Sequence, residues 1–164
     1  MAVNAYLTLK GQRQGPIPGP VTEKGRENSI ELLSFSNQIV SPRDPASGLP
    51  TGQRQHHPIC IVKEIDVAST ALRSAFVNNE NLTSWALQFW TVGAVDPVMD
   101  TETYTIRLTN ANIASIREFL VESEDSANNG LPLREEITFT YQKIEWIWTD
   151  GETTAEDDWE QPVV

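Results

Sequence analysis

The sequence predicts a mostly β protein with one short α-helix, on three observations. Apolar and polar residues alternate in several short segments, most clearly over 103–109, where Tyr104, Ile106 and Leu108 are separated by polar side chains. This period of two is typical of strands with one wet face. Two segments change the parity of their apolar residues partway along, and one segment, at about 69–78, has helical apolar spacing.

The parity changes indicate that two strands each serve two surfaces. Ile30 and Leu32 give way to Leu33 and Phe35, and the apolar positions of 137–148 change from odd to even after residue 141. A strand that switches parity contains a bulge or bend, or faces two surfaces in turn. Strands of this kind turn the corner of a small barrel or join two packed sheets.

The helix is expected to begin at Ser69, whose hydroxyl can cap its first turn. Leu72, Ala75 and Phe76 give it an apolar face. The segment 113–120 fits either a helix or an extension of the preceding strand, and we favour the strand.

Two long loops are predicted before the helix, because seven of the ten prolines and six of the nine glycines lie between residues 11 and 58. The first loop spans 11–28 and the second, an extended loop, spans about 41–57. Loops of this length in a compact domain are uncommon and are usually functional or disordered.

Net charge and chain length limit the partners and the number of domains that we expect. The chain has 164 residues and a net charge of −11, which disfavours nucleic acid and anionic membrane as partners. We expect one domain over 1–149 and an acidic, solvated tail over 150–164. The tail holds Trp159, an aromatic side chain that a purely solubilising segment does not need.

The single cysteine and the N-terminal sequence indicate where the protein is made. Cys60 has no intrachain partner and lies in an apolar run, so we expect a buried, inert thiol in a reducing compartment. The first residues have neither a basic region nor a long apolar stretch, and no segment reaches the ~20 apolar residues of a membrane span. We therefore expect cytoplasmic synthesis, no membrane insertion, and export, if any, without a signal peptide.

A search for chemistry predicts no catalytic, cofactor-binding or metal-binding residues. His56 and His57 are the only histidines, and neighbours on an extended chain point to opposite faces, so they are expected to be ordinary loop residues. Glu135 and Glu136 open a strand and are expected to be solvated. No nucleophile motif or phosphate-binding glycine loop is present. The sequence does not indicate an enzyme.

Eight segments in order resemble the haemolysin-coregulated proteins (Hcp), which form the inner tube of type VI secretion systems. The segments are AYLTLKG at 5–11, SIELLSFS at 29–36, DPASG at 44–48, PTGQR at 50–54, KEID at 63–66, YTIRLTNA at 104–111, YQKIEW at 141–146 and DDW at 157–159. Each is weak alone, but together they cover nearly the whole chain.

The resemblance implies a compact two-sheet β-barrel with one helix. Six copies would form a ring, rings would stack into a tube that a contractile sheath expels, and the partners would be the sheath, the spike and effector proteins in the lumen. The protein would then be secreted through the type VI system. The family has no catalytic residues to transfer. The extended loop would reach a neighbouring subunit or ring.

Particular residues follow from these expectations. In the extended loop, Arg43, Asp44, Leu49 and Arg54 are the candidate interface residues, with Leu49 as the apolar anchor and the arginines as donors to an acidic neighbour. A wide lumen is wet, so the polar face that carries Thr138, Thr140 and Gln142 is the candidate lumen lining. Two alternatives stay open: a monomeric barrel that binds a small ligand in its interior, and a tube subunit of a phage tail or another contractile injection system.

Overall fold

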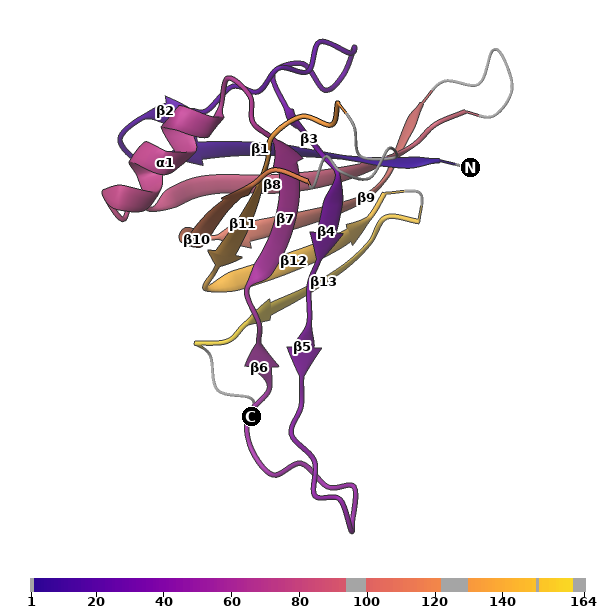
Figure 1. Ribbon diagram of the computed structural model, residues 1–164. Helices are drawn as coiled ribbons and strands as arrows, with labels where there is room; N and C mark the ends of the chain where they lie inside the picture. The colour runs from indigo at the N-terminus through magenta and orange to yellow at the C-terminus, as the bar shows by residue number, and fades with distance from the viewer. Residues whose placement is uncertain (1, 94–99, 122–129, 150, 161–164) are drawn as a thin grey trace.

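The computed structural model describes residues 2–93, 100–121, 130–149 and 151–160, and the mostly β prediction is confirmed (Figure 1). The strands are β1 (Val3–Gly11), β2 (Gly15–Pro16), β3 (Ile30–Leu32), β4 (Ser34–Ser36), β5 (Ile39–Val40), β6 (Gln55–His56), β7 (Ile59–Glu64), β8 (Leu82–Thr91), β9 (Thr101–Thr109), β10 (Asn112–Phe119), β11 (Arg134–Thr140), β12 (Lys143–Trp148) and β13 (Thr153–Asp158). The helix α1 (Ser69–Val77) lies between β7 and β8.

These strands pair into two main antiparallel sheets and one small ribbon. The larger sheet has seven strands in the order β13-β12-β9-β8-β1-β2, with β3 also paired to β1. The second sheet has the order β10-β11-β7-β4, and β5 pairs with β6 as a separate ribbon. The segment 113–120, ambiguous in sequence, lies almost entirely in β10, so the choice of a strand is confirmed.

The core fills the space between the two main sheets. Trp85 of β8 meets Phe139 of β11 edge to face, with ring centroids 5.5 Å apart. Both belong to a cluster of buried apolar side chains that draws on both sheets and on α1. Each large side chain buried in this way contributes roughly 2 kcal/mol to folding.

The two parity changes mark the points where the chain passes from one sheet to the other. β3 pairs with β1 in the large sheet, and after Leu33 the chain continues as β4, which pairs with β7 in the second sheet. In the reverse direction, β11 belongs to the second sheet and β12 to the large one, with Tyr141 and Gln142 between them. The interpretation that these segments join two packed sheets is confirmed.

The helix lies where it was expected, but two of its residues have other roles. Leu72 and Ala75 are buried, whereas Phe76 is 38% exposed and does not complete the apolar face. Ala68 occupies the N-cap position without a side-chain cap, so the expected cap by Ser69 is wrong. The Ser69 hydroxyl instead donates to Glu135 of β11 over 2.9 Å.

A buried ionic cluster joins α1 to the second sheet. Lys63 of β7 and Glu135 of β11 are both fully buried, with Nζ 2.5 Å from Oε1. Arg73 of α1 reaches the other Glu135 oxygen over 2.7 Å. The expectation that Glu135 is solvated is therefore wrong; Glu136, on the opposite face, is partly exposed and lies 3.3 Å from Arg117.

The charge of Glu135 depends on these partners. Burial by itself would raise the pKa of this carboxyl, but the hydrogen bond and positive charge of Lys63, with hydrogen bonds from Arg73 and Ser69, hold its pKa below the ordinary value. Glu135 is therefore an anion at neutral pH, and its carboxylate oxygens accept from Lys63, Ser69 and Arg73.

Thr105 is a second polar residue that the alternation misplaced. It was assigned to the wet face of β9, yet it is only 2% exposed. Its hydroxyl donates to the Glu102 carboxylate three residues earlier, which satisfies the buried group.

We predict that Glu135→Ala lowers the free energy of unfolding by about 3–5 kcal/mol, because buried Lys63 would lose its fully buried anion and keep only Asp66 as an ion-pair partner. Urea denaturation at pH 7 measures this loss. Since the pKa of Glu135 is depressed in the folded state, its contribution is present above about pH 4.3 and disappears as the pH falls through the folded pKa.

The control is Glu136→Ala, which removes a partly exposed carboxylate from the same strand and should cost below about 1 kcal/mol. The double variant Lys63→Met, Glu135→Leu should recover much of the loss, since it removes both fully buried charges together, while Asp66 keeps the Ala68 N–H and Arg73 keeps Glu118. Equal small losses in the two single variants would contradict the role given to Glu135.

Candidate assembly interface

The extended loop is an ordered hairpin that projects beyond both main sheets (Figure 1). β5 and β6 form its stem, and β4 and β7 continue that stem into the second sheet. Farther out, Thr51 N–H donates to the Pro42 carbonyl over 3.0 Å, and Arg43 forms an isolated bridge with Pro50. The long loop expected at 41–57 is present, with residues 55–56 in a strand.

The tip of the loop is a tight turn held by Asp44. The Asp44 carboxylate accepts backbone N–H groups of Ala46 over 2.7 Å and Ser47 over 2.8 Å. These bonds, from Ser47 first, hold the pKa of Asp44 below its ordinary value. Gly48 has a φ of +73°, the left-handed region where glycine carries no Cβ penalty. Asp44, a candidate interface residue, is thus used in shaping the turn.

Two other candidate residues at the tip point into solvent. Leu49 is 65% exposed. Arg43 is exposed and has one weak contact, 3.5 Å from its Nη1 to the Gly48 carbonyl, and it forms no ion pair with any described residue. An apolar and a cationic side chain are thus presented together on a hydrogen-bonded turn.

The root of the loop is bound to the last strand. Arg54 donates through Nε and Nη2 to the two carboxylate oxygens of Asp157, and through Nη2 to the Asp158 carbonyl over 3.3 Å. The fourth candidate residue, Arg54, therefore pairs within its own chain. These bonds, with a further hydrogen bond from His56, hold the pKa of Asp157 below its ordinary value.

His56 completes this root cluster. Its Nε2 lies 2.7 Å from Asp157 Oδ2 and its Nδ1 lies 2.8 Å from the Tyr141 hydroxyl. Burial and the charge of Asp157 raise the pKa of Tyr141 to about 12, so the phenol keeps its proton. The contacts fit a ring protonated on Nε2, with Tyr141 donating to Nδ1. The expectation of an ordinary loop histidine is wrong for His56, whose side chain is 5% exposed; His57 is exposed.

The segment expected as a solvated tail contributes to the sheet. β13 pairs with β12 over its whole length, from Thr153 opposite Trp148 to Asp158 opposite Lys143. The indole N–H of Trp159 donates to the Tyr141 carbonyl, although the side chain stays half exposed. Residues 153–158 are therefore a strand of the large sheet, although most of their side chains are exposed. The pairing of Asp157 with the loop root was not predicted, and the signals available for it were Trp159 and the DDW segment at 157–159.

The polar face of β11 has the predicted register. Ile137, Phe139 and Tyr141 are buried, while Thr140 is exposed and Thr138 is partly exposed. Gln142, beyond the end of the strand, is partly exposed and accepts a hydrogen bond from Asn110 over 2.8 Å. The alternation is thus confirmed for the single chain. The place of this face in an assembly stays a prediction.

The described residues offer no metal centre, since no group of three or more His, Cys, Asp or Glu side chains among them could hold an ion. Cys60 is half-buried, and desolvation raises the pKa of its thiol, which disfavours the reactive thiolate. No helix in the described part of the chain is long and apolar enough to cross a membrane.

Comparisons with known proteins agree with one another. A family model described as "Type VI secretion system effector, Hcp" matches residues 6–148. The chain is 34% identical over 172 aligned positions to the "Major exported protein" of Pseudomonas aeruginosa strain PAO1, covering 99% of each. A structure of the Hcp1 protein of Escherichia coli EAEC 042 is 27% identical with a TM-score of 0.83, covering 96% of this chain and 99% of that one. The secreted protein Hcp3 of Pseudomonas aeruginosa is 26% identical with a TM-score of 0.77 and covers the same shares.

We predict that Asp157→Asn loosens both the loop and β13, because the amide supplies only one oxygen to Arg54 and carries no charge. Amide hydrogen exchange should become faster over 41–57 and over 153–158. The depressed pKa of Asp157 keeps the carboxylate charged in the wild type above about pH 3.9, so exchange at pH 5 and pH 7 should show the same contrast.

The neighbouring variant Asp158→Asn is the matched control, because its carboxylate accepts from Gln142 and from the Glu160 N–H rather than from the loop. Unchanged exchange at 41–57 in Asp157→Asn would contradict the tether between the loop root and the last strand.

Proposed function

Because this chain belongs to the Hcp family of type VI secretion systems, we propose that it is a structural subunit of the inner tube. In this proposal six copies form a ring, rings stack, and the lumen carries or chaperones effector proteins that leave the cell with the tube. The sheath and the spike are its further partners. The name of the Pseudomonas relative, a major exported protein, supports export.

The observation that carries this proposal is the rigid, projecting loop. It has internal hydrogen bonds at its tip and an ionic tether at its root, and it presents Leu49 to solvent at 65% exposure. A loop that is already ordered loses little conformational entropy on docking. Such a feature is suited to contact with another subunit.

The filled interior disfavours the alternative of a small-ligand barrel. Trp85 and Phe139 meet at the centre, and Leu7, Leu87 and Ile137 beside them are fully buried. A carrier of small ligands keeps a cavity at this position. The description of the matching family also favours a type VI tube over a phage tail. Hcp is a structural family, and we propose that this member has no catalytic activity.

We propose that the face with Thr138, Thr140 and Gln142 lines the lumen. Thr138 lies 2.6 Å from Ser115 of the neighbouring strand, and the same face continues into the ion pair of Arg117 with Glu136, so the surface is polar. The outer face of the large sheet is also polar and includes exposed Thr8 and Arg107. A test must therefore compare the two faces.

We predict a hexamer by native mass spectrometry at micromolar concentration. Leu49→Ala should shift the population towards smaller species, since each contact loses roughly 2 kcal/mol of apolar burial. Val77→Ala, at a site 75% exposed on the end of α1, is the matched control and should leave the hexamer intact. A monomer at every concentration tested would contradict the tube function.

We predict that a cysteine at Thr140 becomes protected from a bulky maleimide polymer when rings stack into tubes. The experiment uses a Cys60→Ser background, and Thr8→Cys on the other sheet is the comparison site. Both sites should react equally in the dissociated subunit. Protection of Thr8 with continued reaction of Thr140 would assign the lumen to the large sheet instead.

A further inference from the structure

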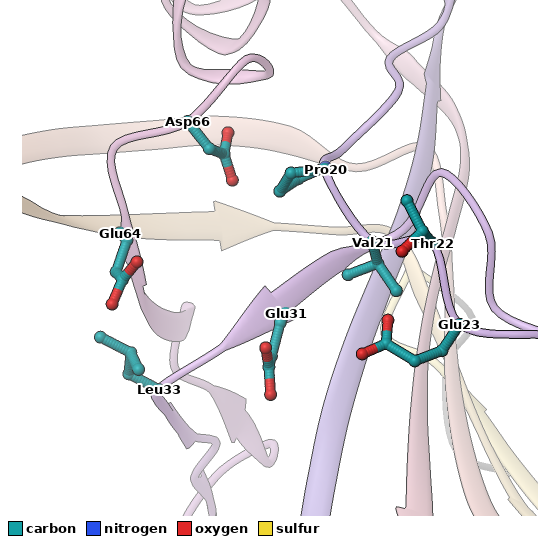
Figure 2. Close-up of a pocket in the computed structure, with 8 residues that line it drawn as sticks. All are labelled: Pro20, Val21, Thr22, Glu23, Glu31, Leu33, Glu64 and Asp66. Carbon is teal, nitrogen blue, oxygen red and sulfur yellow. The ribbon is translucent and has the colours of Figure 1, made fainter.

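A pocket of about 250 Å³ lies where the first loop crosses the end of the second sheet (Figure 2). Pro20 and Val21 of the first loop form part of its wall, and Leu33 lies on its rim beside Glu64, the last residue of β7. Leu33, between β3 and β4, is 47% exposed. The pocket therefore has an apolar part to its wall and is open to solvent at Leu33.

The polar lining of this pocket is acidic apart from Thr22. Glu23, Glu31, Glu64 and Asp66 all contribute, and the side chain of Glu23 points towards Glu31 in Figure 2. Asp66 accepts from the Ala68 N–H over 2.8 Å and lies 3.1 Å from buried Lys63. The three glutamates are exposed and pair with no cation among the described residues.

The chemistry of this lining indicates the kind of group that it accepts. Neighbouring carboxylates repel one another, so a cation placed between them is favourable. The described carboxylates are not arranged to hold a metal ion. A guanidinium group is larger and flat, with five N–H donors that can serve more than one carboxylate. If the bound segment also carried an apolar side chain beside its arginine, that side chain would cover Leu33.

The tip of the extended loop carries both a guanidinium group and an exposed apolar side chain. Arg43 has no ion-pair partner in the described chain, and Leu49, across the Asp44 turn, is 65% exposed. The negative charge of Asp44 is engaged by two backbone N–H groups of the turn itself. The other arginine of the loop, Arg54, is bound to Asp157 and cannot leave the root without breaking that tether.

We propose that this pocket receives the loop tip of a second copy of the chain, with Arg43 between the glutamates and Leu49 against Leu33. The inference rests on the proposed function, because it names the surface that the assembly loop binds. The loop extends from the start of β7 through β6, whereas Glu64 ends β7, so donor and receiver lie at opposite ends of one strand. Such a contact is heterologous, and repetition generates rings or stacks.

A charge-swap experiment tests this contact. Arg43→Glu and Glu64→Arg each place like charges together and should raise the protein concentration at half-assembly about tenfold, measured by native mass spectrometry and negative-stain imaging. The double variant Arg43→Glu, Glu64→Arg restores opposite charges with their positions exchanged, and should assemble within about threefold of the wild type. Glu31→Arg supplies a second receiving variant for the same rescue.

The matched control combines Arg43→Glu with Glu152→Arg, which makes the same change in net charge at an exposed glutamate that is not part of the pocket lining. It should assemble as poorly as Arg43→Glu alone. Circular dichroism and thermal unfolding of every variant check that these surface changes leave the fold intact.

The outcomes separate the two proposals. A wild type that never assembles contradicts the proposed function and the docking together. Wild-type rings combined with an Arg43→Glu variant that assembles normally, or that no pocket variant rescues, contradict the docking alone. If the pocket variants assemble poorly but Arg43→Glu assembles normally, a different cation occupies the pocket. This result also overturns the inference. If Glu152→Arg restores assembly of Arg43→Glu, the loss of assembly reflects net charge alone and the docking is contradicted.

Discussion

The antiparallel pairing of β4 with β7 is the constraint on which the candidate interface depends. The two strands pair from Ser34 opposite Val62 to Ser36 opposite Cys60, and the chain continues from each of them into β5 and β6. Because β7 also pairs with β11 in the middle of the second sheet, this hairpin is anchored in the core. The extended loop is therefore the outer part of a structural hairpin and takes its direction from packed strands.

Two ionic clusters attach α1 and the root of the extended loop to the sheets. Lys63, Glu135 and Arg73 join α1 to the second sheet, and the Lys63–Glu135 pair is fully buried, so each of these two charges depends on its partners. Arg54, His56 and Asp157 join the loop root to the last strand in a partly exposed setting, with His56 the most buried of the three. The first cluster is expected to affect global stability. The second acts locally, on the order of the loop and of β13.

The sequence was sufficient for features that depend on local pattern. Strand alternation and the parity changes at Leu33 and Tyr141 follow from the period of two and from the requirement that apolar side chains reach the core. Glu135, Thr105 and Asp157 were misplaced because their partners decide their burial. Lys63 is 72 residues from Glu135, and Arg54 is 103 residues from Asp157, so no local pattern reveals either pair. The pocket likewise combines Glu23, Glu31 and Glu64 from three segments.

The order within the loop also has a kinetic consequence. A segment that must fold while it binds adds a conformational search to each encounter, and this lowers the productive fraction of collisions. Here the turn at Asp44, the bridge at Arg43 and the bonds at Arg54 already exist before any partner arrives. In the proposed assembly, subunit addition would then be a rigid-body event, whose speed is set by diffusion and orientation. A long structure can grow from such subunits as fast as they are delivered.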